Sequence, residues 1–231
     1  MSSSARVDHL VVMAADLDEG VTWCQDTLGV APGPGGTHPR MGTWNRLLRL
    51  GTALHPRAYL EIIANDTRAS DPQASGERAP GKRWFDMDDE RLHESLVERG
   101  PRLVHFVAEV DDIGAGVTAL AGCGIDRGAV HQMSRSTERG ELQWQITVRE
   151  DGRRLFGGCL PTLIEWENVH PTATMPDSGI GLAALAVTHP QAEQLRAACA
   201  VLGLADVPVR EGAAAVVATL ETPRGRVVLS S

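Results

Sequence analysis

Apolar positions follow a recurring order along the first two thirds of the chain. Strand-like apolar runs at 7–15, 44–50 and 58–64 are interrupted by a stretch of helical spacing that begins after Asp16 and ends at Gly29. The order of strand, helix and further strands returns at 102–110, 113–121, 129–135, 142–148 and 161–168. Because an internal repeat constrains the fold more than any single residue does, the pattern predicts two βαβββ units.

The repeat divides the chain into four parts. We expect a first βαβββ unit over 6–64, a linker with one helix over 65–101, a second βαβββ unit over 102–171, and a C-terminal partial βαββ unit over 180–231. The linker either packs on the outside or covers a cleft. The C-terminal part carries no histidine or carboxylate at the matching strand positions, which indicates a structural role. The predicted fold class is α+β.

Composition and charge exclude several classes of protein. The 231 residues carry a net charge of −8, which is unfavourable for contact with a nucleic-acid backbone. No apolar stretch reaches the roughly 18 residues that a membrane span needs, and no secretory segment opens the chain. The four cysteines are scattered and form no CxxC pair. These features predict a reduced, cytoplasmic protein that contacts neither nucleic acid nor a membrane.

Four polar side chains interrupt strands that are otherwise apolar. They are His9 and Glu61 in the first unit, and His105 and Glu165 in the second. Imidazole and carboxylate groups in apolar strands are costly without a partner. Singly, each has an ordinary interpretation as a core or rim residue. Because the set recurs at matching positions, we expect a divalent cation with mixed nitrogen and oxygen ligands: Zn, Ni, Mn, Co or Fe.

Several short segments resemble a known family. They are Val7-Asp-His-Leu-Val, Gly42-Thr-Trp-Asn-Arg-Leu-Leu, Tyr59-Leu-Glu-Ile, Gly100-Pro-Arg-Leu and Pro161-Thr-Leu-Ile-Glu-Trp. Together with the repeat, this series resembles the vicinal oxygen chelate superfamily and, within it, the glyoxalase-like domain family. The resemblance implies that the two units pair and that their curved mixed sheets surround a cleft holding a metal. Carried over residue by residue, it implies His9, Glu61, His105 and Glu165 as the four ligands.

The resemblance implies a metal-dependent isomerase or lyase. Its small substrate would present vicinal oxygens and react through an enediolate-like intermediate. Either Glu61 or Glu165 would act as the base, and the sequence leaves that choice open. Candidate substrate-binding residues on the same strands are Asn45, Arg49, Tyr59 and Gln143.

Two alternatives remain open. A non-catalytic protein that sequesters a small ligand would use Trp44, Trp144 and Trp166 for stacking. An extradiol-type dioxygenase would hold iron with two histidines and one carboxylate, although Glu61 would add an unwanted fourth ligand. In each case the partner is a small molecule, and a second copy of the chain, as a homodimer, is a further candidate.

Overall fold

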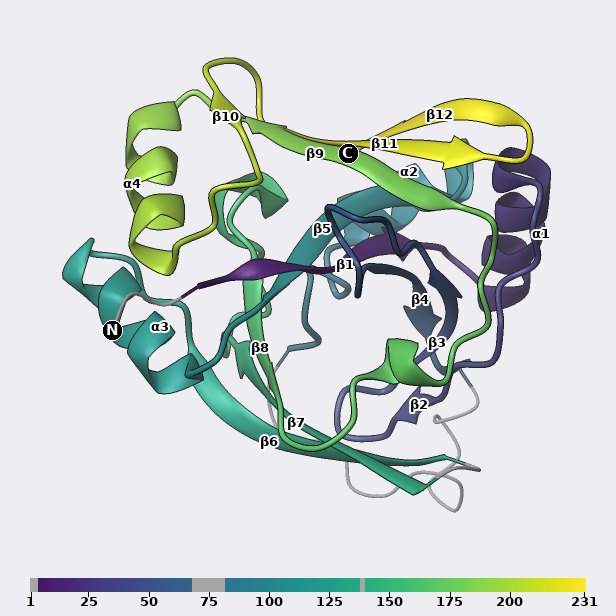
Figure 1. Cartoon of the computed structure of the whole chain (residues 1–231), viewed down its shortest axis with the longest axis horizontal. Coiled ribbons are helices and arrows are strands. Elements are labelled where there is room, and N and C mark those ends of the chain that lie inside the picture. The colour runs from purple at the N-terminus through teal and green to yellow at the C-terminus, as the bar shows by residue number, and fades with distance from the viewer. Residues whose placement is uncertain (1–3, 68–81, 138–139) are drawn as a thin grey trace.

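The structure is a computed structural model that describes residues 4–67, 82–137 and 140–231. Figure 1 shows the elements in chain order. The first half contains β1 (Arg6–Met13), α1 (Leu17–Leu28), β2 (Thr37–His38), β3 (Thr43–Arg49), β4 (Tyr59–Asn65) and α2 (Glu90–Arg99). The second half contains β5 (Arg102–Glu109), α3 (Ile113–Gly122), β6 (Ala129–Thr137), β7 (Gly140–Val148), the short 3-10 helices η2 (Leu155–Gly158) and η3 (Pro171–Ala173), and β8 (Thr162–Trp166). The C-terminal part contains β9 (Gly181–Thr188), α4 (Ala192–Leu202), β10 (Val209–Arg210), β11 (Ala215–Thr222) and β12 (Gly225–Ser230).

The two repeated units form one curved eight-stranded sheet. Its order is β2-β3-β4-β1-β5-β8-β7-β6, so the two first strands, β1 and β5, pair antiparallel at the centre. On either side, the fourth strand of each unit joins parallel to the first, as β4 does to β1 and β8 does to β5. The predicted α+β fold with two paired βαβββ units around a cleft is therefore confirmed. The exact unit boundaries remain predictions, and residues 68–81 of the expected linker lie outside the described part.

The helix ends follow local signals in the sequence. The Asp16 side chain accepts hydrogen bonds from the backbone N–H groups of Asp18 and Glu19, and α1 begins there. The helix ends at Gly29, whose φ of 81° lies in the left-handed region that glycine adopts without strain. Asp112 caps α3 in the same way through the N–H of Ala115. These boundaries confirm the helix predictions for both units.

The sheet has an apolar layer on each face. On the convex face, α1 packs Leu17, Cys24 and Leu28 against β3 and β4, and α3 packs against β8. On the concave face, a smaller cluster includes Val11, Ile63 and residues of β6, β7 and β8. Because one face is covered by helices and the other curves inward, side chains on the concave face surround an interior space.

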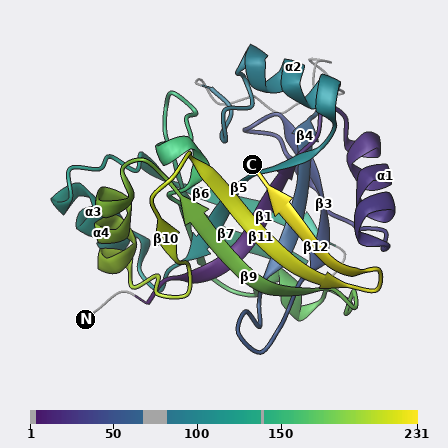
Figure 2. The ribbon, with the colours of Figure 1, turned by 90° about the horizontal axis from the view of Figure 1, so that it is seen from above.

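The C-terminal part adds a separate four-stranded sheet of order β10-β9-β11-β12. Figure 2 shows it lying across β1 and β5, with α4 beside α3. Buried Leu182, Leu185 and Leu220 join the convex-face core, as do side chains of α4. This sheet covers the part of the convex face that α1 and α3 leave open, so it stabilises the centre of the fold. Among the described helices none is long and apolar enough to cross a membrane.

A β-bulge in β1 changes which side chains face the cleft. Val7 pairs with Ala108 and His9 pairs with Val107, so Asp8 is an extra residue in the ladder. As a result, Val7 belongs to the convex-face core, whereas His9 faces the concave side. Strict alternation along β1 would have placed both side chains on one face. The bulge also allows the neighbouring side chains of Asp8 and His9 to meet.

Candidate active site

A cavity lies on the concave face of the sheet. Its volume is about 450 Å³, counting its opening to solvent. The first unit supplies polar walls from His9, His38, Asn45, Tyr59 and Glu61, and the second supplies apolar walls from Trp144, Ile146, Ile164 and Trp166 together with one cation, Arg135. Trp84 and Phe85, from the segment between the units, complete the lining. The cavity is therefore polar on one side and largely aromatic on the other.

His9 and Glu61 lie next to each other in the wall of this cavity. They lie on adjacent parallel strands, β1 and β4, and both are buried. His9 Nε2 is 3.6 Å from Glu61 Oε2. The other carboxylate oxygen, Oε1, accepts a hydrogen bond of 2.6 Å from Asn45 Nδ2. Tyr59 stacks on the His9 ring at 4.6 Å between centroids. A base and a potential acid thus face the same small space.

Asp8 holds the His9 ring from behind. Its Oδ1 lies 2.5 Å from His9 Nδ1, and its Oδ2 accepts hydrogen bonds of 2.9 Å from both His170 Nε2 and Trp166 Nε1. Burial alone would raise the pKa of Asp8, but the hydrogen bonds with His170 and His9 outweigh it and lower that pKa. An ionised carboxylate only accepts, so Nδ1 of His9 donates and Nε2 is left for the cavity.

The burial of Tyr59 and His38 fixes their protonation states. Burial, with the negative charges of Asp8 and Glu61, raises the pKa of Tyr59 well above 10, so it remains a neutral phenol. Burial, with the positive charges of Arg135 and His9, lowers the pKa of His38 to about 3, so this imidazole is neutral at pH 7. Neither of these two side chains therefore changes its protonation state near neutral pH.

His105 does not join His9 and Glu61. It is fully buried, with Nδ1 2.9 Å from the carbonyl oxygen of Gly158 and Nε2 3.1 Å from Thr162 Oγ1. The Phe85 ring packs over it. Burial, followed by the nearby charge of Arg127, lowers the pKa of His105 well below 6.5. Both ring nitrogens are thus committed to structural hydrogen bonds.

Glu165 points to the opposite face of the sheet. Its Oε2 accepts a hydrogen bond of 2.7 Å from the backbone N–H of Ile113, at the N-terminus of α3. Ile164 and Trp166, its neighbours on β8, occupy the positions that face the cavity. The four ligands expected from the sequence are therefore not brought together: two line the cavity and two serve the fold.

The other candidate residues divide in the same way. Asn45 and Tyr59 line the cavity, as expected for substrate-binding residues. Arg49 instead donates to the carbonyl oxygen of Thr172 at 2.9 Å, and Gln143 donates to Glu141 Oε2 at 3.0 Å on the outside. Of the three tryptophans proposed for stacking, Trp144 and Trp166 line the cavity, whereas Trp44 packs against the convex-face core.

Sequence reasoning missed Asp8, His38, Arg135 and His170. The only local signal for Asp8 is an aspartate inside an apolar strand, next to His9. The other three come from loops or edge strands that are distant in the sequence, and their convergence depends on the tertiary fold. Both histidines are buried.

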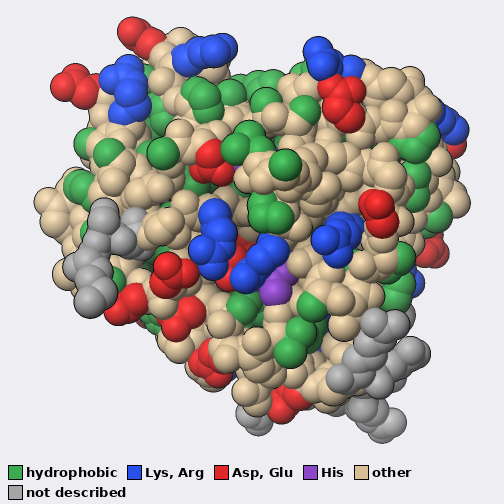
Figure 3. Space-filling view, viewed as in Figure 1, with side chains coloured by type: hydrophobic (Ala, Val, Ile, Leu, Met, Phe, Trp, Pro, Cys, Tyr) green, Lys and Arg blue, Asp and Glu red, His purple; other side chains and the backbone are tan. Residues whose placement is uncertain are grey.

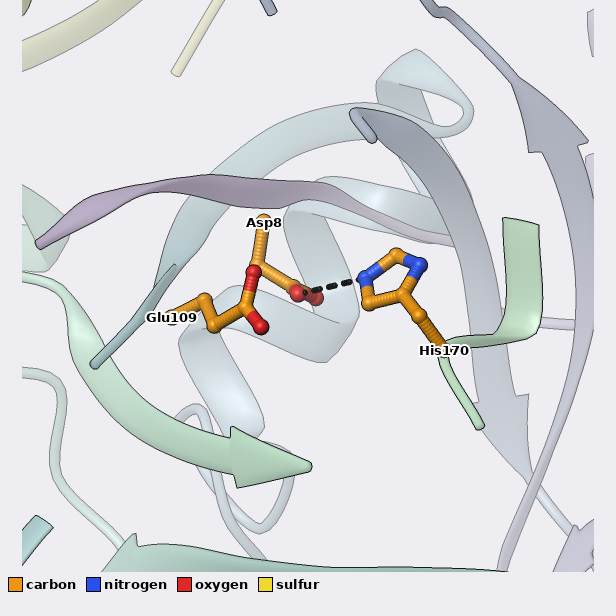
Figure 4. A group of neighbouring side chains, drawn as sticks. All are labelled: Asp8, Glu109 and His170. Carbon is orange, nitrogen blue, oxygen red and sulfur yellow. Dashed lines mark hydrogen bonds and ion pairs between the residues drawn. The ribbon is translucent and has the colours of Figure 1, made fainter. Parts of the chain in front are cut away.

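One group of side chains has the composition of a metal site. Ligand atoms of Asp8, Glu109 and His170 lie within 4.8 Å of one another, and Figure 4 shows the bond between Asp8 and His170 with Glu109 beside it. However, Glu109 forms ion pairs with Arg6, at 2.8 Å, and with Arg57. Asp8 already has three hydrogen-bond partners. The charges of this group are therefore balanced by the protein itself.

The residues present do not fit the four-ligand metal centre expected from the sequence. His9 and Glu61 offer one nitrogen and one oxygen ligand, whereas catalytic metal sites typically have three protein ligands. His105 and Glu165 are bound elsewhere. The cavity side chains are therefore suited to acid–base chemistry of their own.

Comparison with known proteins agrees with this fold. Residues 7–203 match the model of the glyoxalase-like domain, so the chain belongs to that family, within the vicinal oxygen chelate superfamily. No curated protein matches the sequence. A hypothetical protein from Staphylococcus aureus is similar in structure, with 16% identity and a TM-score of 0.56 over 98% of this chain and 85% of that chain.

Methylmalonyl-CoA epimerases are more distant structural neighbours. The enzyme from Mycobacterium tuberculosis has 19% identity and a TM-score of 0.38, covering 72% of this chain and 90% of that chain. A variant of the Streptomyces coelicolor enzyme, in complex with 2-nitronate-propionyl-CoA, has 16% identity and a TM-score of 0.41, covering 69% of this chain and 96% of that chain.

Proposed function

We propose that this glyoxalase-like protein is an isomerase or lyase that moves a proton at a carbon next to an oxygen-bearing carbon of a small substrate. The observation that carries the proposal is the pair of His9 and Glu61, held 3.6 Å apart on one wall of a buried cavity. A carboxylate and an imidazole in such a position are suited to general acid–base catalysis.

Glu61 is the proposed base. Its carboxylate would take the proton from the substrate C–H bond, and the electron pair of that bond would form the C=C bond of an enediolate. Negative charge then develops on the substrate oxygen. His9, donating from Nε2 when protonated, would stabilise that oxygen and return a proton. Asn45 keeps the Glu61 carboxylate in place through its hydrogen bond to Oε1.

Asp8 has a positioning role in this scheme. By accepting from Nδ1 it turns Nε2 of His9 toward Glu61. A carboxylate behind a histidine fixes the tautomer that the reaction needs. The metal-dependent form of the reaction would need ligands from solvent or substrate beside His9 and Glu61, and no step above depends on it. A cytoplasmic location and homodimer formation remain predictions from the sequence.

The sequestering alternative is favoured by one observation, the aromatic wall of Trp144 and Trp166. Such a wall binds a flat ligand whether or not a reaction follows. The dioxygenase alternative has no comparable support, because His105 and Glu165, two of its three iron ligands, lie outside the cavity.

Proton exchange tests the proposal. The purified protein is incubated in D₂O with a panel of glyceraldehyde, lactate, mandelate, pyruvate and phenylpyruvate, and the C–H signals beside the oxygen-bearing carbons are followed by proton NMR. We expect protein-dependent loss of such a signal for at least one compound, above the rate without protein. Binding of panel members without any exchange would contradict catalysis and support sequestration.

A further inference from the structure

We infer that Arg135 anchors a carboxylate of the substrate and that the tryptophan wall holds an apolar, preferably aromatic, body. The substrate class is then an aromatic 2-oxo or 2-hydroxy acid. This inference rests on the proposed function for the placement of the reacting carbon. The binding of an anion by Arg135 rests on observations of its own.

Arg135 is a cation in the cavity, and no carboxylate among the described residues is paired with it. It reaches in from β6, and its Nη1 donates to the neutral side-chain oxygen of Asn45, at 3.3 Å. Its Nε is buried and has no hydrogen-bond partner. Within the described part of the chain, no carboxylate forms an ion pair with it. A partly buried guanidinium with a buried, unpartnered N–H is costly, so this arrangement favours an incoming anion.

Glu61, the carboxylate that lines the cavity, does not serve as the anionic partner of Arg135. One oxygen of Glu61 accepts from Asn45 and the other faces His9. Burial lowers the pKa of Arg135, although the negative charge of Glu61 acts in the opposite direction. Arginine remains charged in proteins despite such shifts. Its fork of N–H donors matches the two oxygens of a carboxylate.

The loop at Gly35 and Gly36 is shaped around this guanidinium. A Cβ atom on Gly36 would lie 2.5 Å from Arg135 Cδ and 2.8 Å from Nη1. On Gly35 it would lie 2.1 Å from the backbone oxygen of Asn45. The N–H of Gly36 donates to Asn45 Oδ1 at 2.8 Å, the same oxygen that accepts from Arg135. The loop and Asn45 therefore hold Arg135 in the cavity rather than allowing it to extend into solvent.

Two groups of aromatic rings line the same cavity as Arg135. Trp144 and Trp166 lie 5.5 Å apart between ring centroids, and Trp84 stacks on Phe85 at 5.2 Å. A ligand that reaches from Arg135 toward these rings needs an anionic end and a flat apolar body.

A ligand with one negative charge, such as a carboxylate, suits this cavity better than a ligand with two, such as a phosphate. Asp8 and Glu61 already place two carboxylates in or beside it, so the extra charge of a phosphate would be repelled more strongly. In a 2-oxo acid the carbonyl oxygen is next to the carboxylate, so anchoring one group presents the vicinal oxygen to the first-unit wall. Figure 3 also shows positively charged side chains gathered around the middle of one face, beside a histidine. Such charges would attract anions to the protein surface.

Calorimetric titration with phenylpyruvate tests the inference. The wild-type protein should bind it at least tenfold more tightly than its uncharged methyl ester. Arg135→Gln should weaken binding of the acid at least tenfold but barely change binding of the ester. Arg135→Lys, which keeps a charge but loses the fork, should fall between. Arg46→Gln removes a cation from β3 that stacks on Trp44, away from the cavity, and should bind like the wild type.

Three results would overturn the inference. The first is equal binding of phenylpyruvate by the wild type and Arg135→Gln, with unchanged melting temperatures. The others are equal affinity of the wild type for the acid and its methyl ester, and selective binding of phenyl phosphate by the wild type. Glu61→Gln separates the two proposals, because it should keep or improve phenylpyruvate binding while losing proton exchange. Binding that depends on Arg135 without exchange in the wild type would refute the proposed function alone. Exchange that is indifferent to Arg135 would refute this inference alone.

Discussion

Replacing Glu61 by glutamine is expected to slow substrate C–H exchange by roughly 10²- to 10⁴-fold, the contribution typical of a general base. Glutamine has nearly the same shape and keeps an oxygen that can accept the hydrogen bond from Asn45 Nδ2. The substitution therefore removes basicity while leaving the wall of the cavity in place. The measurement is the exchange rate constant by proton NMR, at saturating concentration of the most active compound of the panel.

Glu167→Gln provides the matched control. Glu167 follows β8, is exposed, and accepts from Gln145 Nε2 at 3.1 Å outside the cavity. Its replacement changes the net charge by the same amount as Glu61→Gln, and the exchange rate should stay near that of the wild type. A Glu61→Gln protein that exchanges protons as fast as the control would remove Glu61 from the mechanism.

The second large effect is a loss of stability in mild acid. His38 is buried, and its pKa in the folded protein is about 3, against about 6.5 for a solvated imidazole. Between these values the unfolded chain binds the proton that the folded chain rejects, so stability falls as the pH falls below 6.5. At pH 5 this histidine alone should cost about 2 kcal/mol of unfolding free energy. Asp8, whose pKa is lowered, loses its contribution only below about pH 4.

Urea unfolding at pH 7 and pH 5 measures this effect. We expect His38→Gln to lose less stability between the two pH values than the wild type, even where it is less stable at both. His93, which is exposed on α2, supplies the control, since His93→Gln should keep the wild-type difference. An equal pH dependence in His38→Gln and the wild type would show that His38 is not the neutral, buried group described above.

The fold was predictable because short-range sequence patterns indicate the helices and strands of each repeated unit. The capping aspartates at 16 and 112 and Gly29 mark helix ends directly. Apolar spacing marked the strands, and the order of elements in the two units implied how they pair. These signals act over a few residues, and they are the same in any protein that contains such helices and strands.

The site was less predictable because the strands of the two units do not present equivalent positions to the cavity. The bulge at Asp8 turns His9 to the concave face and sends Val7 to the other. On β8, alternation places Glu165 on the convex face, where the start of α3 supplies its partner. A glutamate in a strand carries no mark that distinguishes these faces. Matching positions in the repeat therefore predicted equivalent roles that the two glutamates do not have.

The sequence also does not specify which distant residues come together in the folded chain. Asp8 and His170 are far apart in the sequence, yet they form a hydrogen bond beside the His9 ring. Arg135 comes from an edge strand in which neighbouring residues are exposed. Only the curvature of the sheet brings these side chains to one cavity, and residue spacing along the chain does not specify that curvature.

The proposed mechanism assigns proton abstraction to Glu61 in the first unit and gives Glu165 in the second unit no part in it. The most direct test is the exchange rate constant of Glu165→Gln, measured beside that of Glu61→Gln below the melting temperature of both. Because Glu165 caps α3, we expect its replacement to lower stability by about 0.5–2 kcal/mol and to leave exchange within roughly twofold of the wild type. A loss of exchange in Glu165→Gln as large as that in Glu61→Gln would contradict the account.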